Sequence, residues 1–279
     1  MSVTGLLRDP AGRFSPLKTV VLLLVLWPAA ALAWRWQVHG LGPRPINEAI
    51  HITGHWAVRF LLLSLAVTPA RAVLDWPRAA ILRRLLGVTA ACYAGGHLLL
   101  YGLDQRWNLG KIAGELALRF YLAIGFVALL GLLTLAITST NGWQKRLKRN
   151  WKRLHRLTYG IAVLALFHYF LQSKIDVFDA TFAAGLFCWL MLWRIAPAGW
   201  RGRLLPLPIL AVTAGVATAV VETAWYGLGT NVDPLRVLAA NLAGPRPAIE
   251  VTAAGLALAV VAALRAAWRR TRPAVRRPA

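Results

Sequence analysis

The stretch WKRLHRLTYGIAVLALFHYF, residues Trp151–Phe170, joins a strongly basic start to a long apolar run and contains two histidines, His155 and His168. A helix that crosses a bilayer needs about 20 mostly apolar residues, which this stretch supplies. Basic residues directly before such a run are typical of the cytoplasmic end of a span. An imidazole deep in an apolar span is costly to place in lipid, so His168 indicates a functional site inside a membrane.

The composition of the whole chain agrees with a membrane protein. It has 279 residues, of which 58% are hydrophobic, and its mean hydropathy is +0.56. This is more apolar surface than a soluble domain carries. The net charge of +22 does not indicate nucleic acid, because the chain has no nucleic-acid-binding motif. The two cysteines, Cys92 and Cys188, lie in separate apolar runs, which argues against a disulfide framework or a cysteine metal site.

The apolar runs predict an all-α integral membrane protein with about eight transmembrane helices, a six-helix core followed by two C-terminal helices. Only helices and closed barrels satisfy their backbone hydrogen bonds in lipid. The expected spans are 18–36, 49–70, 85–103, 116–138, 154–172, 179–196, 204–228 and 248–268.

The basic residues predict an orientation. With the N-terminus in the cytoplasm, 22 of the 32 Lys and Arg residues fall in cytoplasmic segments and 8 on the opposite side. This bias follows the positive-inside rule, so both termini are expected in the cytoplasm. Tryptophans near the span ends, such as Trp34, Trp107 and Trp268, agree with an interfacial aromatic belt.

His97 and His168 are expected at the same depth. Both belong to spans that run outward, and each lies a dozen or so residues from the cytoplasmic start of its span. Two imidazoles at one depth on facing helices are suited to axial ligation of one haem iron, which favours electron transfer because no coordination position stays open. Gly95 and Gly96 leave room for a flat macrocycle beside the helix. The alternative is that the two histidines only form hydrogen bonds between helices.

His155 lies about 20 Å from His168 along the helix axis, near the cytoplasmic start of the same span. The residue at its depth on the span of His97 is Arg83, so the sequence offers no second pair of histidine ligands. Three roles stay open for His155: a single haem ligand, a ligand that shares its haem with a group other than histidine, or a hydrogen-bond partner of a haem propionate or a quinone.

Several further residues are secondary candidates for contacts to propionates, quinone or flavin. His51, His55 and Arg59 form one stripe on the second span, with an alternative role as a polar seam near the outer surface. Arg83, Arg84 and Arg119 suit anionic groups, with lipid anchoring as the alternative. The basic loop at 143–156 is expected either to bind anionic lipid or to dock a phosphate-bearing flavin.

Five segments together resemble the MsrQ family, the haem-binding membrane subunits of periplasmic methionine sulfoxide reductase systems within the ferric reductase-like transmembrane superfamily. They are GLGPRPINEAIHITGHWAVRFLLLSLAVTPAR at 40–71, RRLLG at 83–87 followed by His97, AITST at 136–140, WKRLHRLTY at 151–159, and the subsequent His168. The resemblance covers residues 15–195 and implies an electron-transfer subunit of an oxidoreductase, without catalytic residues of its own.

The resemblance also implies cofactors, partners and a location. The family's haem ligands match His97, His155 and His168, and its histidine before the TG motif matches His51. One haem b, with a second at His155 as an option, and FMN are the implied cofactors. Electrons would come from the quinone pool or a flavin reductase and pass to a periplasmic molybdopterin-containing methionine sulfoxide reductase subunit. The implied location is the bacterial inner membrane.

The chain departs from the family pattern in three places. It has RFY at Arg119–Tyr121 where the family usually has RPY, and Lys148 where the family often has glycine. Residues 200–279 add two spans and a basic tail, expected as a second domain. Two alternatives stay open: a ferric reductase-like protein with another acceptor, and a transporter or scaffold without haem.

Overall fold

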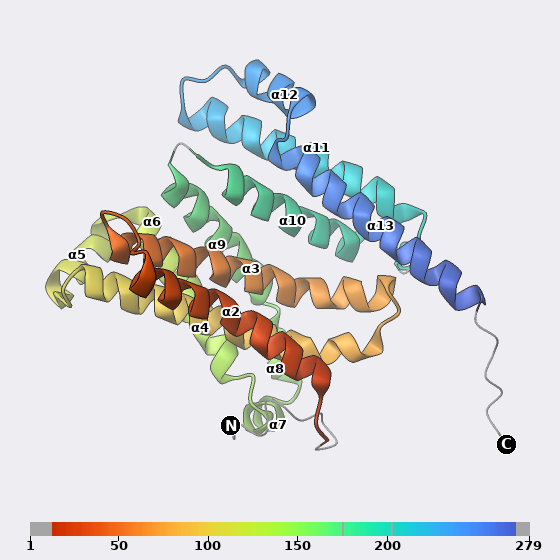
Figure 1. Cartoon of the computed structure of the whole chain (residues 1–279), viewed down its shortest axis with the longest axis horizontal. Helices are drawn as coiled ribbons and strands as arrows, with labels where there is room; N and C mark the ends of the chain where they lie inside the picture. Colours follow the sequence, from red (N-terminus) through yellow and green to blue (C-terminus); the bar gives the residue numbers. More distant parts are fainter. Residues whose placement is uncertain (1–12, 175, 202, 272–279) are drawn as a thin grey trace. The chain divides into compact units, whose positions relative to one another are not determined.

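The computed structural model describes residues 13–174, 176–201 and 203–271, and its secondary structure is helical (Figure 1). Eight helical segments of this described part are long and apolar enough to cross a membrane. The prediction of an all-α membrane protein with eight spans is therefore confirmed.

The spanning segments follow the predicted order, with bounds that differ by a few residues. They are α2 (Pro16–Val38), α3 (Pro45–Val73), η1 (Pro77–Ile81) continued by α4 (Leu82–Asp104), α6 (Phe120–Ile137), α8 (Arg149–His155) followed by α9 (Thr158–Ser173), α10 (Phe178–Ile195), α11 (Pro206–Gly229) and α13 (Pro247–Thr271).

Short helices occupy connections that the apolar pattern left as loops. They are α5 (Leu109–Leu118), α7 (Asn141–Leu147), η2 (Ala198–Trp200) and α12 (Pro234–Ala243). Local caps explain where three of them begin, because the side-chain oxygens of Asn108, Thr140 and Asp233 each accept a backbone N–H of the first turn.

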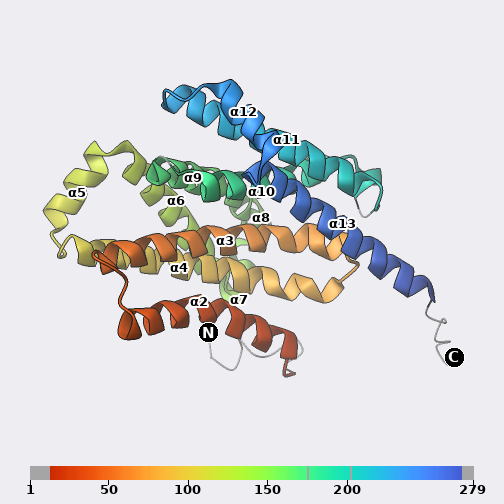
Figure 2. The same ribbon diagram turned by 45° about the horizontal axis from the view of Figure 1, so that its top comes forward.

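The helices form two compact units. The first contains the chain up to Leu65 and Ile81–Lys174, and the second contains Ala66–Ala80 with the chain after Lys174. In the first unit α6 packs most extensively against α9 and also contacts α4, while α2 lies along α4 (Figures 1 and 2). The helices that carry His97 and His168 thus both pack against α6.

A tyrosine joins α2 to α4 at an interrupted turn. Pro28 lies inside α2 and has no backbone donor. In the same turn, the hydroxyl of Tyr93 on α4 accepts a hydrogen bond from the Ala29 N–H at 3.0 Å and donates one to the Val25 carbonyl at 2.8 Å. A side chain of α4 therefore satisfies backbone groups of α2.

The end of α4 is a Schellman motif. The Trp107 N–H donates to the Gly102 carbonyl at 2.8 Å, and the Arg106 N–H donates to the Leu103 carbonyl at 2.9 Å. Arg106 and Trp107 both have positive φ, 52° and 55°. The indole of Trp107 packs where a Cβ of residue 102 would stand, 2.7 Å from Cζ3, so glycine is required there.

In the second unit, α10, α11 and α13 cross closely at three glycines. A Cβ at Gly185 would overlap the Thr218 side chain, one at Gly215 would overlap Thr252, and one at Gly255 would stand 2.5 Å from the Ala211 Cβ. Small residues at helix crossings are the usual means of close packing in membranes.

A buried ion pair holds the short helix α12 in the second unit. The carboxylate of Glu222 on α11 is almost completely buried. It accepts hydrogen bonds from Arg246 at 2.5 Å and from the Asn241 side chain on α12 at 2.8 Å. The two donors compensate the cost of burying the carboxylate.

Candidate functional site

His97 projects from α4 toward α3. Its Nδ1 lies 2.9 Å from the carbonyl oxygen of Ile50. Because a carbonyl can only accept, this contact requires the proton on Nδ1 and leaves the lone pair on Nε2. The ring passes close to Gly54, where a Cβ would stand 3.1 Å from Nδ1 and 3.3 Å from Cε1. The glycine therefore provides the space that the imidazole occupies.

His168 projects from α9 toward α6 in the same manner. Its Nδ1 lies 2.8 Å from the carbonyl oxygen of Tyr121, which again places the proton on Nδ1. A Cβ at Gly125 would stand 2.6 Å from both Nδ1 and Cε1 of this ring. In both cases the histidine bonds the carbonyl of residue i on a neighbouring helix and packs beside a glycine at i+4. A backbone carbonyl and a glycine four residues later therefore hold each of the two imidazoles.

The imidazole rings of His97 and His168 lie close to each other. Their ring centroids are 6.4 Å apart and their planes are 86° from parallel. Two metal–imidazole bonds of about 2 Å, with about 1.1 Å from each nitrogen to its ring centre, give a centroid separation of about 6.2 Å. The observed separation of the ring centroids is therefore close to that of two imidazoles bound to one metal ion. Each Nε2 also carries the free lone pair that such a bond requires.

The stripe on α3 divides between a half-buried residue and two exposed ones. His55 lies against Tyr169 of α9, with ring centroids 4.8 Å apart. His51 lies beyond it, 6.4 Å from the His55 ring, and is exposed. Arg59 is exposed, with its guanidinium 5.1 Å from the Trp56 ring. His55 is therefore the member of the stripe that packs inside the unit.

His155 lies at the opposite end of the unit with both ring nitrogens engaged. Its Nδ1 is 3.1 Å from the Trp151 carbonyl, and its Nε2 is 3.3 Å from the Ser139 hydroxyl. The ring stacks on the Trp151 indole with centroids 4.0 Å apart. Among the described residues, no second imidazole lies opposite His155, in contrast to the pair His97 and His168. The positive charge of Arg83 on α4 acts electrostatically on the His155 ring.

The remaining arginine candidates lie apart from the paired imidazoles. Arg83 is exposed, and Arg84 donates to the Asn141 side chain at 2.6 Å. Arg119 precedes α6, is exposed, and donates to the Tyr121 hydroxyl at 3.1 Å. This hydrogen bond, with the charge of Glu115, raises the pKa of Arg119 above its ordinary value.

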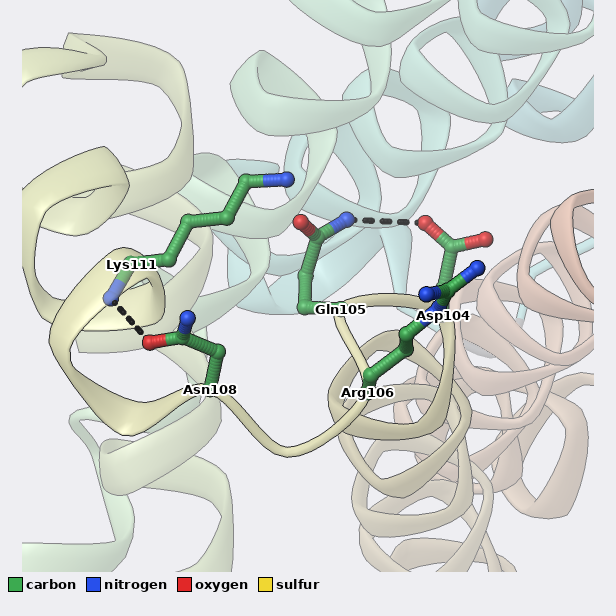
Figure 3. A pocket seen from close by; sticks show the side chains of 5 residues that line it. All are labelled: Asp104, Gln105, Arg106, Asn108 and Lys111. Atoms are coloured by element: carbon green, nitrogen blue, oxygen red, sulfur yellow. Dashed lines mark hydrogen bonds between the residues drawn. The ribbon is translucent and has the colours of Figure 1, made fainter.

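An open polar pocket of about 480 Å³ lies at the turn between α4 and α5 (Figure 3). It is lined by Asp104, Gln105, Arg106, Asn108 and Lys111. The Gln105 amide donates to Asp104 at 2.8 Å, and the Asn108 side chain accepts the Lys111 backbone N–H. Asp104 is seven residues after His97, so the pocket lies about 10 Å from that histidine along α4.

The chain matches known proteins over most of the first unit, which contains His97 and His168. Residues 53–166 match the model of the ferric reductase-like transmembrane component. A protein-methionine-sulfoxide reductase heme-binding subunit MsrQ from Xanthomonas euvesicatoria is 44% identical over 185 residues, 64% of this chain and 85% of the relative. The MsrQ protein of Caulobacter vibrioides is 39% identical over 186 residues, 66% of this chain and 87% of the relative.

The chain belongs to the MsrQ family. Its expected resemblance to that family is thereby confirmed. No solved structure gives a significant match. About a third of the chain lies outside the match to these MsrQ relatives.

Sequence reasoning missed the groups that orient the paired histidines in this MsrQ-family chain. These are the carbonyls of Ile50 and Tyr121 and the glycines at 54 and 125. The only signal in the sequence was the repeated spacing of four residues between carbonyl and glycine, which is meaningful only once the facing helices are known. The contact between Tyr101 and Glu115 was likewise missed, because α5 was expected to be a loop.

Proposed function

We propose that the protein is a b-type cytochrome subunit that carries electrons across a bacterial inner membrane to a periplasmic methionine sulfoxide reductase. The observation that carries this proposal is the pair formed by His97 and His168. Each has its Nδ1 proton on a carbonyl and its Nε2 lone pair free, and the ring centroids are 6.4 Å apart.

The residues around this pair fit a haem. Among the described residues, no group of three or more His, Cys, Asp or Glu side chains is arranged to hold a metal ion. Two imidazoles are therefore suited to a metal that brings its own equatorial ligands, as porphyrin iron does. A Cβ at Gly95 or Gly96 would meet no atom of the described chain within 4 Å, which leaves space beside α4.

A haem bound between His97 and His168 would supply a one-electron carrier with no open coordination position. The protein's own groups fix its ligands. The Ile50 and Tyr121 carbonyls select the tautomer in which Nε2 faces the metal, and they make each imidazole a stronger donor. The apolar helices around them keep water away, which raises the influence of every nearby charge on the potential.

The proposed direction of transfer follows from the distribution of basic residues. The region of α7 and α8 is strongly basic, which favours a cytoplasmic location and a cytoplasmic position for both termini. The paired histidines then lie in the outer half of the bilayer, close to a periplasmic acceptor. The polar pocket at the α4–α5 turn would open on the same outer side.

His155 is the proposed contact of the electron-donating side. Its position beside Trp151 and near Arg83 suits a quinone head group or a flavin phosphate. Ligation of a second haem would require His155 to give up the Ser139 hydroxyl. We therefore propose one haem, held by His97 and His168, with quinol or a flavin reductase as donor.

The proposed haem domain comprises residues 15–195, and residues 200–279 are an addition to it. The extent of the match to the MsrQ relatives supports this division, because it leaves about a third of the chain uncovered. The named activity of those relatives motivates the methionine sulfoxide reductase as acceptor. A ferric reductase-like protein with a different acceptor is the alternative that the family model at 53–166 favours.

The deciding experiment is a reduced-minus-oxidised visible spectrum of the purified protein. We expect a b-type spectrum with one haem per chain, lost in His97→Ala and in His168→Ala and partly restored by added imidazole. His39→Ala is the matched control, since His39 is an exposed residue at the end of α2. A wild-type protein without haem, despite haem supply during expression, would reject the cytochrome in favour of a transporter or scaffold.

The acceptor is tested separately in reconstituted membranes. A protein with reduced haem is mixed with a periplasmic molybdopterin methionine sulfoxide reductase and, in parallel, with ferric citrate. Reoxidation by the reductase supports the proposed acceptor. Reoxidation by ferric citrate alone supports the ferric reductase-like alternative.

A further inference from the structure

Glu115 connects the two parts of the protein that hold His97 and His168. It lies on α5, the short helix between α4 and α6 (Figure 2). Its Oε2 accepts a hydrogen bond from the Tyr101 hydroxyl of α4 at 2.7 Å. Its Oε1 lies 3.5 Å from the Arg119 guanidinium, which directly precedes α6.

Each contact of Glu115 leads to one of the paired histidines. Tyr101 is four residues after His97, so both lie on the same face of α4, one turn apart. Arg119 donates to the hydroxyl of Tyr121, and the carbonyl of Tyr121 holds the Nδ1 of His168. The carboxylate therefore contacts the helix of one imidazole directly through Tyr101. It reaches Tyr121, whose carbonyl orients the other imidazole, indirectly through Arg119, which lies four residues after Glu115.

We propose that Glu115 is a positioning residue that sets the gap between His97 and His168. The inference rests on the proposed binding of haem between those two side chains. The gap of 6.4 Å between ring centroids depends on the distance between α4 and the start of α6, because His97 belongs to α4 and His168 is fixed to Tyr121. Within the described part of the chain, the Glu115 side chain makes polar contacts both to Tyr101 of α4 and to Arg119, the residue before α6.

The burial of the Glu115 side chain supports its role as a positioning residue. It is only 17% exposed, whereas its partner Arg119 is 52% exposed. A largely buried carboxylate held by two donors is more rigid than a surface ion pair, and loss of one donor leaves it poorly satisfied. Its negative charge near the proposed haem also favours the oxidised iron, so removal of the charge should raise the midpoint potential.

The test compares Glu115→Gln, Glu115→Asp and Tyr101→Phe with a control, Glu48→Gln. Glu48 is an exposed carboxylate in the first turn of α3. Within the described part of the chain, its side chain forms no hydrogen bond to α4 or α6. The readouts are the midpoint potential, the low-spin ferric electron paramagnetic resonance spectrum, and the rate of haem transfer to apomyoglobin. None of these depends on turnover with an acceptor.

We expect Glu115→Gln to raise the midpoint potential and to accelerate haem loss about tenfold, as for other outer-shell partners of metal ligands. Tyr101→Phe should accelerate haem loss without removing the charge, so its potential should change less. Glu115→Asp keeps the charge with a shorter reach and should restore the potential more than the haem loss rate. Glu48→Gln should match the wild type in all three readouts.

Two results would overturn the inference. One is a Glu115→Gln protein whose potential, spectrum and haem loss equal those of the wild type. The other is an equal effect of Glu48→Gln, which would indicate a general surface-charge effect. Failure of the proposed function is distinguishable from both, because the wild-type protein would then contain no haem at all.

Discussion

Gly125 lies directly against the imidazole of His168, so closely that a Cβ at this position would stand 2.6 Å from two ring atoms. We expect Gly125→Ala to push the ring away from the Tyr121 carbonyl and to abolish or strongly reduce haem binding. The measurement is the haem-to-protein ratio from the visible spectrum. The reason is steric, since real Cβ atoms do not approach other side chains this closely and a packed core resists displacement.

The matched control for this substitution is Gly160→Ala. Gly160 is also a helical glycine, in α9, but it is exposed, and a Cβ there would meet no atom of the described residues within 4 Å. We expect Gly160→Ala to keep full haem content, with a small gain in stability because alanine is the better helix former. Full haem content in Gly125→Ala would contradict the proposed position of the His168 ring.

The near-perpendicular imidazole planes predict a characteristic resonance signal. With planes 86° apart, the two iron orbitals that interact with the ligand rings become nearly equal in energy. The ferric protein should therefore give a strongly anisotropic low-spin signal with one dominant large g value. His155→Ala should leave it unchanged, because His155 ends a different helix, α8, and its ring lies against Trp151 and Ser139. A three-line rhombic signal would instead indicate nearly parallel rings.

Lys148 adopts a backbone conformation that favours glycine. Its φ and ψ are 46° and −119°, close to the first central position of a type II′ turn. Such a conformation costs a non-glycine residue roughly 1–3 kcal/mol. Lys148→Gly should therefore stabilise the protein by about 1 kcal/mol, after subtraction of the extra chain entropy of glycine.

The melting temperature in detergent tests this prediction, with Lys152→Gly as the control of opposite sign. Lys152 lies inside α8, where glycine should cost about 1 kcal/mol. If both substitutions lower the melting temperature equally, the backbone conformation of Lys148 does not reduce the stability of the protein.

The buried ion pair of the second unit predicts a large stability effect. Glu222→Ala removes the carboxylate that pairs with Arg246 and Asn241, and leaves both donors without this partner. We expect a loss of roughly 3–5 kcal/mol, typical for removal of one partner of a buried pair. Glu250→Ala, at an exposed site in the first turn of α13, should cost less than about 1 kcal/mol. Similar unfolding midpoints in sodium dodecyl sulfate titrations of the two variants would contradict this expectation.

The spans and the proximity of His97 to His168 were predictable, because both follow from the length and polarity of the apolar runs. Eight apolar runs define eight helices, and counting residues from the basic ends places His97 and His168 at one level. The ring separation of 6.4 Å agrees with that level. The amphipathic helices α5 and α12 escaped detection, since ten residues in a connection carry too weak a periodic signal.

The groups that hold the histidines were not predictable from one sequence. Ile50 and Tyr121 contribute backbone carbonyls, which every residue has, so their side chains give no signal. Gly125 is one of 23 glycines, and its role depends on which face of α6 meets α9. The positive φ at Lys148 was not predicted, because a lysine gives no signal for it. The pairing of Glu222 with Arg246 was not predicted either, because the two residues lie on different helical segments whose packing a single sequence does not give.

The bridge between Tyr93 and the turn at Pro28 has a consequence for biogenesis. The first span leaves the ribosome well before Tyr93, which follows Ala29 by 64 residues. Before the third span is made, the Val25 carbonyl and the Ala29 N–H can pair with each other, since they are helical partners four residues apart. The link through Tyr93 can form only after the third span has entered the membrane, so we expect the first span to join the bundle late. Tyr93→Phe should weaken this late association, measured by crosslinking between the first and third spans, and should leave insertion of the first span itself unchanged.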